Sequence, residues 1–100
     1  MIHIVWEFRA RAGMEREFER RYSSTGDWAR LFAKGDGYQG STLLRDAQDP
    51  RRYLVTDVWR DAASFAAFKQ EHAAAYAALD KECEALTESE VHIGTFEILT

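Results

Sequence analysis

His72 and Tyr76 are the side chains best suited to carry chemistry, because each places a polar, titratable group on an otherwise apolar stripe. The stripe recurs at steps of three and four between residues 65 and 86, which is the spacing of one helix face. Imidazole titrates near neutral pH, so His72 could act as a general base or hydrogen-bond donor in a pocket. The alternative is that His72 lies at the edge of the stripe with its ring partly in water.

Aromatic residues provide a second chemical signal. On strands and apolar helix faces, such residues usually pack as a solid core. They could also enclose a flat apolar cavity suited to a planar aromatic ligand. A break in the first helical region, between Tyr22 and Trp28, would then form the mouth of that cavity. The residues expected to contact the ligand are Trp6, Tyr22, Trp28, Trp59 and Phe68.

Several kinds of site have no counterpart in the sequence. No glycine-rich phosphate loop, CxxC, HExxH or GxSxG motif occurs. The three histidines (His3, His72 and His92) lie far apart without short ligand spacing, so no metal site is expected. Cys83 is the only cysteine, which excludes an internal disulfide and fits a reducing cytoplasm. On the apolar stripe, its thiol is expected to be buried and structural.

The charge pattern argues against nucleic acid and membranes as partners. The net charge is −4, whereas a nucleic-acid binder carries a basic patch. Arginines crowd residues 9–21, but glutamates are interspersed among them, as on a solvated helix face. The first residues lack the basic and apolar regions of a signal peptide, and no stretch approaches the ~18 apolar residues of a membrane span. A cytoplasmic protein is therefore expected.

The predicted elements indicate an α+β fold in a single domain, residues 1–100. Strands are expected at 2–10, 38–46, 52–60 and 89–99. Helical spacing links Met14, Phe18 and Tyr22, and again Trp28, Leu31 and Phe32, with Ser24 or Thr25 as cap of the second segment. A long helix is expected from Asp61 to about residue 86. The order βαββαβ is the ferredoxin-like arrangement, a four-stranded antiparallel sheet with helices on one face.

Apolar residues on both faces of several strands predict a homodimer. In the strand at 52–60, Leu54 and Val58 point away from the face that carries Tyr53. In the last strand, residues 91 and 93 are expected on one face of the sheet and residues 96 and 98 on the other, unless Gly94 introduces a bulge. Helices on one side cannot cover both faces, so a second copy related by a two-fold axis is the simplest cover for the other.

Two sequence motifs carry a family resemblance. Residues 37–46 (GYQGSTLLRD) open the predicted hairpin, and residues 53–59 (YLVTDVW) precede Asp61 and the helix with Phe65 and Phe68. Together with the break at Gly13 and the amphipathic helix that follows it, this pattern resembles the antibiotic biosynthesis monooxygenase (ABM) family over nearly the whole chain. The resemblance implies a dimeric α/β barrel with one pocket per subunit between sheet and helices.

The resemblance also implies an activity. Characterised ABM members oxygenate aromatic polyketides or quinols with molecular oxygen, often without metal, flavin or haem, because the substrate anion itself reduces oxygen. No cofactor is therefore expected here. A haem-degrading branch uses Asn, Trp and His at positions that hold Trp6, Phe68 and Ala78 in this chain, so haem cleavage is not expected.

Two hypotheses of different kind remain, with haem binding as a minor third. The first is a cofactor-independent monooxygenase acting on a small quinol- or anthrone-like substrate, with His72 and Tyr76 as catalytic residues. The second is a non-catalytic ligand-binding or stress-related dimer in which the aromatic residues are only core. A cavity between sheet and helices is the feature that separates the two hypotheses.

Overall fold

A four-stranded antiparallel sheet forms one layer of the protein, which a computed structural model describes over residues 1–100. The strands are β1 (Ile2–Ala10), β2 (Tyr38–Arg45), β3 (Arg52–Trp59) and β4 (Thr87–Glu97). Their order across the sheet is β2-β3-β1-β4, with every neighbouring pair antiparallel. The predicted α+β, ferredoxin-like fold is confirmed.

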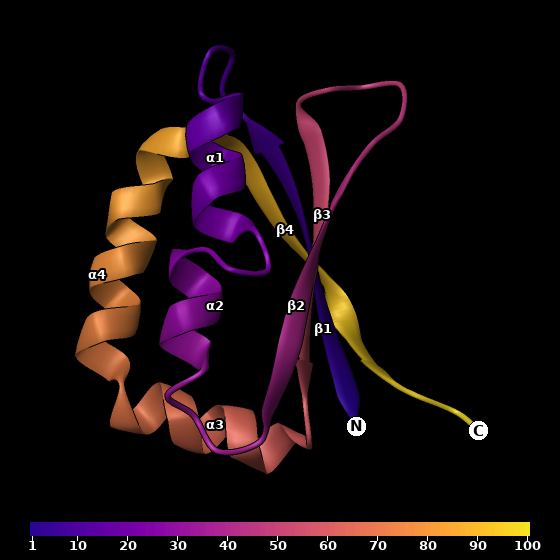
Figure 1. Ribbon diagram of the computed structural model, residues 1–100, viewed down its shortest axis with the longest axis vertical. Coiled ribbons are helices and arrows are strands. Elements are labelled where there is room, and N and C mark those ends of the chain that lie inside the picture. The colour runs from indigo at the N-terminus through magenta and orange to yellow at the C-terminus, as the bar shows by residue number, and fades with distance from the viewer.

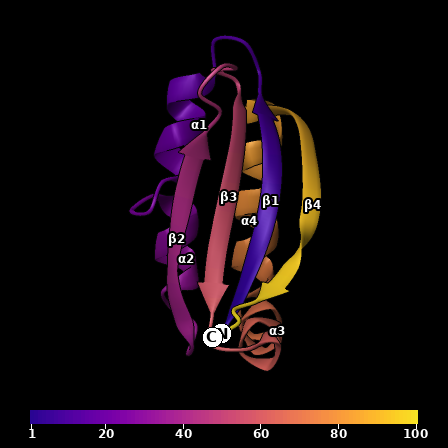
Figure 2. The ribbon, with the colours of Figure 1, turned by 90° about the vertical axis from the view of Figure 1, so that its right-hand side faces the viewer.

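The helices cover only one face of this sheet (Figure 1). They are α1 (Glu15–Tyr22), α2 (Asp27–Phe32), α3 (Ala62–Glu71) and α4 (Ala73–Cys83), followed by the 3₁₀ turn η1 (Glu84–Leu86). Figure 2 shows the opposite face of the sheet, which no element of this chain covers. None of the helices combines the length and the apolar character needed to cross a membrane.

Side-chain alternation in β1 and β3 follows the predicted faces. Trp59 and Tyr53 of β3 lie under the helices and are almost fully buried, whereas Leu54 and Val58 lie on the open face and are half-buried. In β1, Val5 likewise lies on the open face, opposite the buried Ile4 and Phe8. Alternation in a strand depends only on local backbone geometry, so it can be predicted without knowledge of the tertiary structure.

A bulge in β4 changes its faces. Val5 pairs with Gly94 and Trp6 pairs with His92, which leaves Ile93 without a partner. Because of this extra residue, residues 91 and 96 lie on the same face of the sheet. Of the two alternatives that the sequence left open, the bulge near Gly94 occurs, and Val91 and Phe96 do not lie on opposite faces.

The single long helix expected from Asp61 to about residue 86 is wrong. Asp61 does cap a helix, since its carboxylate accepts a hydrogen bond from the Ser64 amide at 2.8 Å. This helix ends at Glu71, and His72 has φ −116° and ψ 29°, which separates α3 from α4. The chain turns at this point, so that α3 closes one end of the sheet and α4 runs along it (Figure 1). Periodicity missed the break because the apolar stripe continues across it.

The expected cap of the second helix is also wrong. Gly26 is the N-cap of α2, and no side chain caps this helix. A Cβ atom on Gly26 would lie 2.5 Å from the Arg20 carbonyl oxygen and 2.6 Å from that of Arg21. The chain therefore needs glycine here, because the turn between α1 and α2 passes directly over the end of α1.

Candidate active site

A cavity that opens to solvent lies between the helices and the inner face of the sheet. Eight of its twelve lining residues are hydrophobic, so apolar surface dominates the wall. The aromatic members are Trp6, Phe8, Tyr22, Trp28, Phe32 and Tyr76. A wall of this kind suits a flat, largely apolar ring system.

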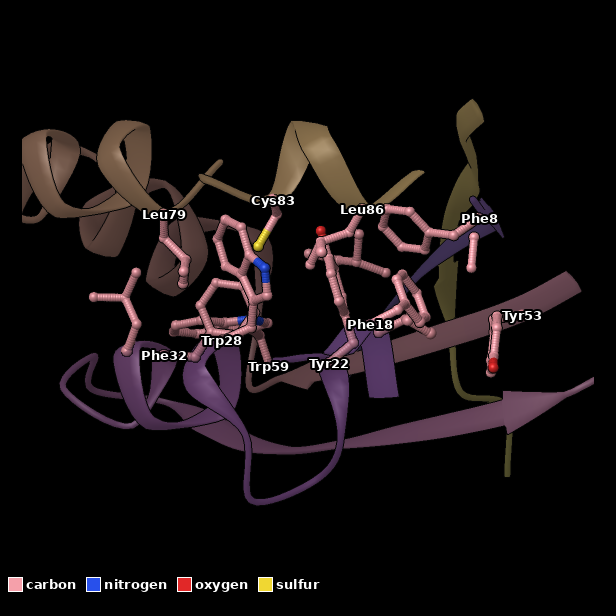
Figure 3. Packing of buried hydrophobic residues seen from close by; sticks show 14 of the residues in the cluster. Phe8, Phe18, Tyr22, Trp28, Phe32, Tyr53, Trp59, Leu79, Cys83 and Leu86 are labelled. Carbon is pink, nitrogen blue, oxygen red and sulfur yellow. The ribbon is translucent and has the colours of Figure 1, made fainter. Parts of the chain in front are cut away.

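The short helix α2 brings one side of the wall against the sheet. Trp28 and Phe32 are one helical turn apart, so both side chains leave the same face of α2, and both are buried. On the other side, Tyr76 of α4 meets the Trp28 ring edge-on, with centroids 5.2 Å apart and an interplanar angle of 71°. Figure 3 shows Trp28, Tyr22 and Cys83 grouped between α4 and the α1–α2 segment.

Asp57 of β3 provides a carboxylate in this apolar surrounding, with only 7% of its surface exposed. The Ser41 hydroxyl donates a 2.6 Å hydrogen bond to Asp57 Oδ1. The Tyr38 hydroxyl lies 2.6 Å from Ser41 Oγ, and because Ser41 uses its single proton on Asp57, Tyr38 is the donor in that pair. Asp57 Oδ2 accepts no hydrogen bond from the protein.

A second bulge makes this polar chain geometrically feasible. Tyr38 pairs with Trp59 and Gly40 pairs with Val58, so Gln39 is extra. Tyr38 and Ser41, three residues apart, thereby lie on the same inner face of β2. Gly40 has φ +126°, a backbone conformation that residues other than glycine rarely adopt.

Burial controls the acidity of Asp57. Removal from water raises the pKa of this carboxyl to about 6, and the hydrogen bond from Ser41 lowers it by a smaller amount. No arginine, lysine or histidine forms an ion pair with Asp57. At neutral pH the side chain is therefore mostly ionised and still basic enough to accept a proton.

Two further carboxylates, Asp80 of α4 and Glu90 of β4, line the same cavity and are exposed at its mouth. Burial raises the pKa of Glu90, and the negative charges of Asp80 and Glu84 raise it further. Burial, followed by the charges of Asp80, Glu90 and Asp57, raises the pKa of the Tyr76 hydroxyl to about 12. The cavity thus has an aromatic wall and an acidic lining.

The structure brings together four of the seven residues expected at the site. These are Trp6, Tyr22, Trp28 and Tyr76, which all line the cavity. Trp59 and Phe68 lie outside it, with 0% and 1% of their surface exposed and ring centroids 5.3 Å apart. His72 lies at the junction of α3 and α4, where its ring packs 5.1 Å from that of Phe68 and does not line the cavity.

Sequence reasoning missed the acidic residues of the site and Ser41. A signal for Asp57 was present in the alternation of β3, because Asp57 occupies the same face as Tyr53, Val55 and Trp59. A carboxylate on a face that is otherwise buried requires a specific reason, since burial of an unpaired charge is unfavourable. Asp80 and Glu90 carry no comparable signal, because exposed acids are ordinary on helices and edge strands.

No three His, Cys, Asp or Glu side chains come close enough together to hold a metal ion. The three cavity carboxylates are thus spread over three elements and do not form a chelating group.

Comparisons with known proteins agree with this architecture. The sequence model of the antibiotic biosynthesis monooxygenase family matches residues 1–79. Among solved structures, the chain is similar to SnoaB, a cofactor-independent oxygenase from Streptomyces nogalater, at 24% identity over 99% of this chain and 93% of that one, with a TM-score of 0.73. A search of curated proteins finds no match.

Two further solved structures assigned to the same family support the fold. One is from Bordetella bronchiseptica, at 19% identity over 99% of this chain and 97% of that one, with a TM-score of 0.80. The other is from Deinococcus radiodurans. It is 14% identical over 100% of this chain and 94% of that one, with a TM-score of 0.77. At these identities the likeness establishes the fold alone.

Proposed function

Because this chain belongs to the antibiotic biosynthesis monooxygenase family, we propose that it is a cofactor-independent oxygenase that oxidises a small aromatic compound in the cavity beside Asp57. One observation carries the proposal. A buried carboxylate with one unpartnered oxygen and a pKa of about 6 lies among aromatic walls.

The proposed substrate has either a quinol hydroxyl or, as in an anthrone, an acidic CH₂ group that is conjugated with a ketone through the aromatic rings on either side of it. Asp57 Oδ2 removes one proton, and the resulting anion transfers an electron to molecular oxygen. Recombination forms a carbon–oxygen bond, and protonation gives a hydroperoxide. For the anthrone type, loss of water leaves a carbonyl, so one oxygen atom enters the product and the other leaves with the two hydrogens.

The other residues of the site have supporting roles in this proposal. Ser41 holds Oδ1, which leaves Oδ2 free for the substrate. Trp28 and Tyr76 contact each other edge-on and together form one wall for the ring, and with Trp6 they limit access of water to the anion. Tyr22 extends the same wall. The proposal gives the role of base to Asp57 rather than to His72, whose ring packs against Phe68 outside the cavity.

Oxygen uptake tests the proposal directly. Anthrone, 1,8-dihydroxyanthrone and 1,4-naphthohydroquinone are supplied to the wild-type protein, Asp57→Asn and the exposed control Asp36→Asn. We expect uptake well above the buffer rate for the wild type and the control, and a loss of about 100-fold or more in Asp57→Asn. Saturable binding of these compounds without uptake would instead indicate the ligand-binding dimer.

We also propose that the protein is a homodimer that pairs through the open face of the sheet. Leu44, Val91 and Phe96 lie on this face with 50%, 49% and 51% of their surface exposed. Val58 and Leu54 extend the same apolar surface across β3. A large continuous apolar patch is uncommon on a monomer, and a two-fold axis would cover two such patches at once.

A further inference from the structure

We infer that the cavity selects an aromatic ligand that carries a protonated amine, with the ring between the aromatic walls and the ammonium group beside Asp80 and Glu90. The inference rests on the proposed function in taking the cavity as the ligand site. It goes further in assigning a charge to the ligand.

All three carboxylates of the cavity lack a cationic partner. Asp57, Asp80 and Glu90 form no salt bridge, whereas ten of the fourteen other acidic residues do. None of the thirteen lysines and arginines lines the cavity. Every acid of the cavity is thus unpaired, whereas most acids elsewhere are paired, and a cationic ligand would supply the missing positive charge.

Burial at the inner end of the cavity strengthens this electrostatic preference. Asp57 has only 7% of its surface exposed, and its Oδ2 accepts no hydrogen bond from the protein. A negative charge with little water around it acts over a longer range than one at the surface. A ligand carboxylate, sulfonate or phosphate would meet three charges of its own sign without a compensating donor from Arg or Lys.

The aromatic walls add to the preference for a cation. The faces of indole and phenol rings carry negative electrostatic potential and attract ammonium groups. The chain already uses this property beside the cavity, where Lys69 Nζ lies 5.1 Å from the centre of the Tyr76 ring and 5.5 Å from that of Phe65. Lys69 itself does not line the cavity, so the carboxylates at the mouth remain available.

An ammonium ion fits this arrangement better than a metal ion does. Metal binding needs several ligand atoms at one point, and the three carboxylates do not form such a group. An ammonium group on a flexible arm needs only one or two nearby carboxylate oxygens. During oxidation, the positive charge of the ammonium group would also offset the negative charge of the deprotonated ring system.

Three phenols that differ mainly in the charge of the para side chain provide the test. Tyramine carries an ammonium group, 4-propylphenol is neutral, and 3-(4-hydroxyphenyl)propanoate carries a carboxylate. Binding is measured by titration of the indole N–H signals in NMR spectra, where Trp6 and Trp28 report on the cavity and the buried Trp59 serves as the internal reference. We expect tyramine to bind about tenfold more tightly than 4-propylphenol at low salt, and the carboxylate to bind most weakly.

Matched variants assign the preference to residues. Asp80→Asn combined with Glu90→Gln should bring tyramine and 4-propylphenol to nearly equal affinity without weakening 4-propylphenol. Glu71→Gln combined with Glu97→Gln removes the same charge from unpaired acids outside the cavity and should leave the tenfold ratio intact. Equal affinity of the two phenols in the wild type, or an equal ratio in both double variants, would overturn the inference. These outcomes do not depend on oxygen uptake, so a failure of the proposed oxygenase activity is detected separately.

Discussion

Ser41 and Asp57 lie directly opposite each other on β2 and β3, and the hydrogen bond between them fixes the orientation of the carboxylate in the cavity. The bond occupies one carboxylate oxygen and leaves the other free. It also stabilises the charged form of Asp57, while burial opposes that form. The acidity of Asp57 therefore depends first on its burial and then on this cross-strand hydrogen bond.

The first prediction concerns the pH dependence of oxygen uptake. Because the proposed base must be ionised, the wild-type rate should rise with pH through about 6. Ser41→Ala removes the hydrogen bond that lowers the pKa of Asp57, so the midpoint should move upward by roughly one unit. Thr42→Ala, which removes a hydroxyl from the other face of the same strand, should leave the midpoint unchanged. Identical midpoints in all three proteins would remove Asp57 as the base.

The second prediction concerns stability. The pKa of Asp57 is about 6 in the folded protein and near 3.8 when unfolded, so the folded state binds more protons between these values. Its contribution to the free energy of unfolding is thus fully present below about pH 4 and is lost as pH rises through about 6. Above that range the ionised side chain costs up to about 3 kcal/mol.

Asp57→Asn avoids this cost and should raise the free energy of unfolding by roughly 1–3 kcal/mol at pH 7 to 8, with little change near pH 3.5. Urea unfolding of both proteins across this range gives the difference. The difference isolates Asp57 from carboxyls such as Asp46 and Asp49, whose lowered pKa values change stability in the opposite direction. A variant that is less stable than the wild type at neutral pH would contradict the prediction.

The third prediction separates the roles of His72 and Tyr76. His72 contacts Phe68 and not the cavity, so His72→Ala should keep oxygen uptake within about twofold. Tyr76 forms a wall, so Tyr76→Ala should raise KM by about tenfold, while Tyr76→Phe keeps the ring and most of the affinity. A large loss of kcat in His72→Ala, with an unchanged circular dichroism spectrum, would restore His72 as a catalytic residue.

The fourth prediction concerns assembly. Sedimentation equilibrium at micromolar concentration should give a mass about twice that of the 11.5 kDa chain. Phe96→Asp places a charge on the open face and should yield monomers, because a buried unpaired carboxylate disfavours association. Ala66→Asp, at an exposed position of α3 on the helical side, should leave the mass unchanged. A monomeric wild type would rule out the proposed pairing.

Much of the fold could be predicted because it depends on local rules. Alternation assigned Tyr53 and Leu54 to opposite faces, and Asp61 marked the start of α3. The break at His72 has no local cause, since neither glycine nor proline occurs near it. It follows from the need to turn α4 along the sheet. A property of that kind depends on how the elements pack and is not encoded in the spacing of apolar residues.

The candidate site was predictable only in its apolar part. Trp28 and Tyr76 stand out as aromatic residues near a helix break or on an apolar stripe. Asp57 appears in the sequence as one polar residue in a strand, and its significance depends on residues from α2 and α4 that surround it. Trp59, although equally conspicuous in the sequence, became part of the solid core because α3 and α2 close over it.

Ile93, which has no partner in β1, determines where β4 can lose a residue without changing its faces. Ile93, between His92 and Gly94, is one of two surplus residues in the pairing of β4 with β1, and Glu88 near the start of the strand is the other. Removal of Ile93 would restore a regular ladder at this point without moving Val91 or Phe96 to the other face. A one-residue deletion, which in an ordinary strand inverts every side chain beyond it, can therefore be absorbed at this point. At this point the last strand can therefore lose one residue and still present the same side chains to the cavity and to the open face.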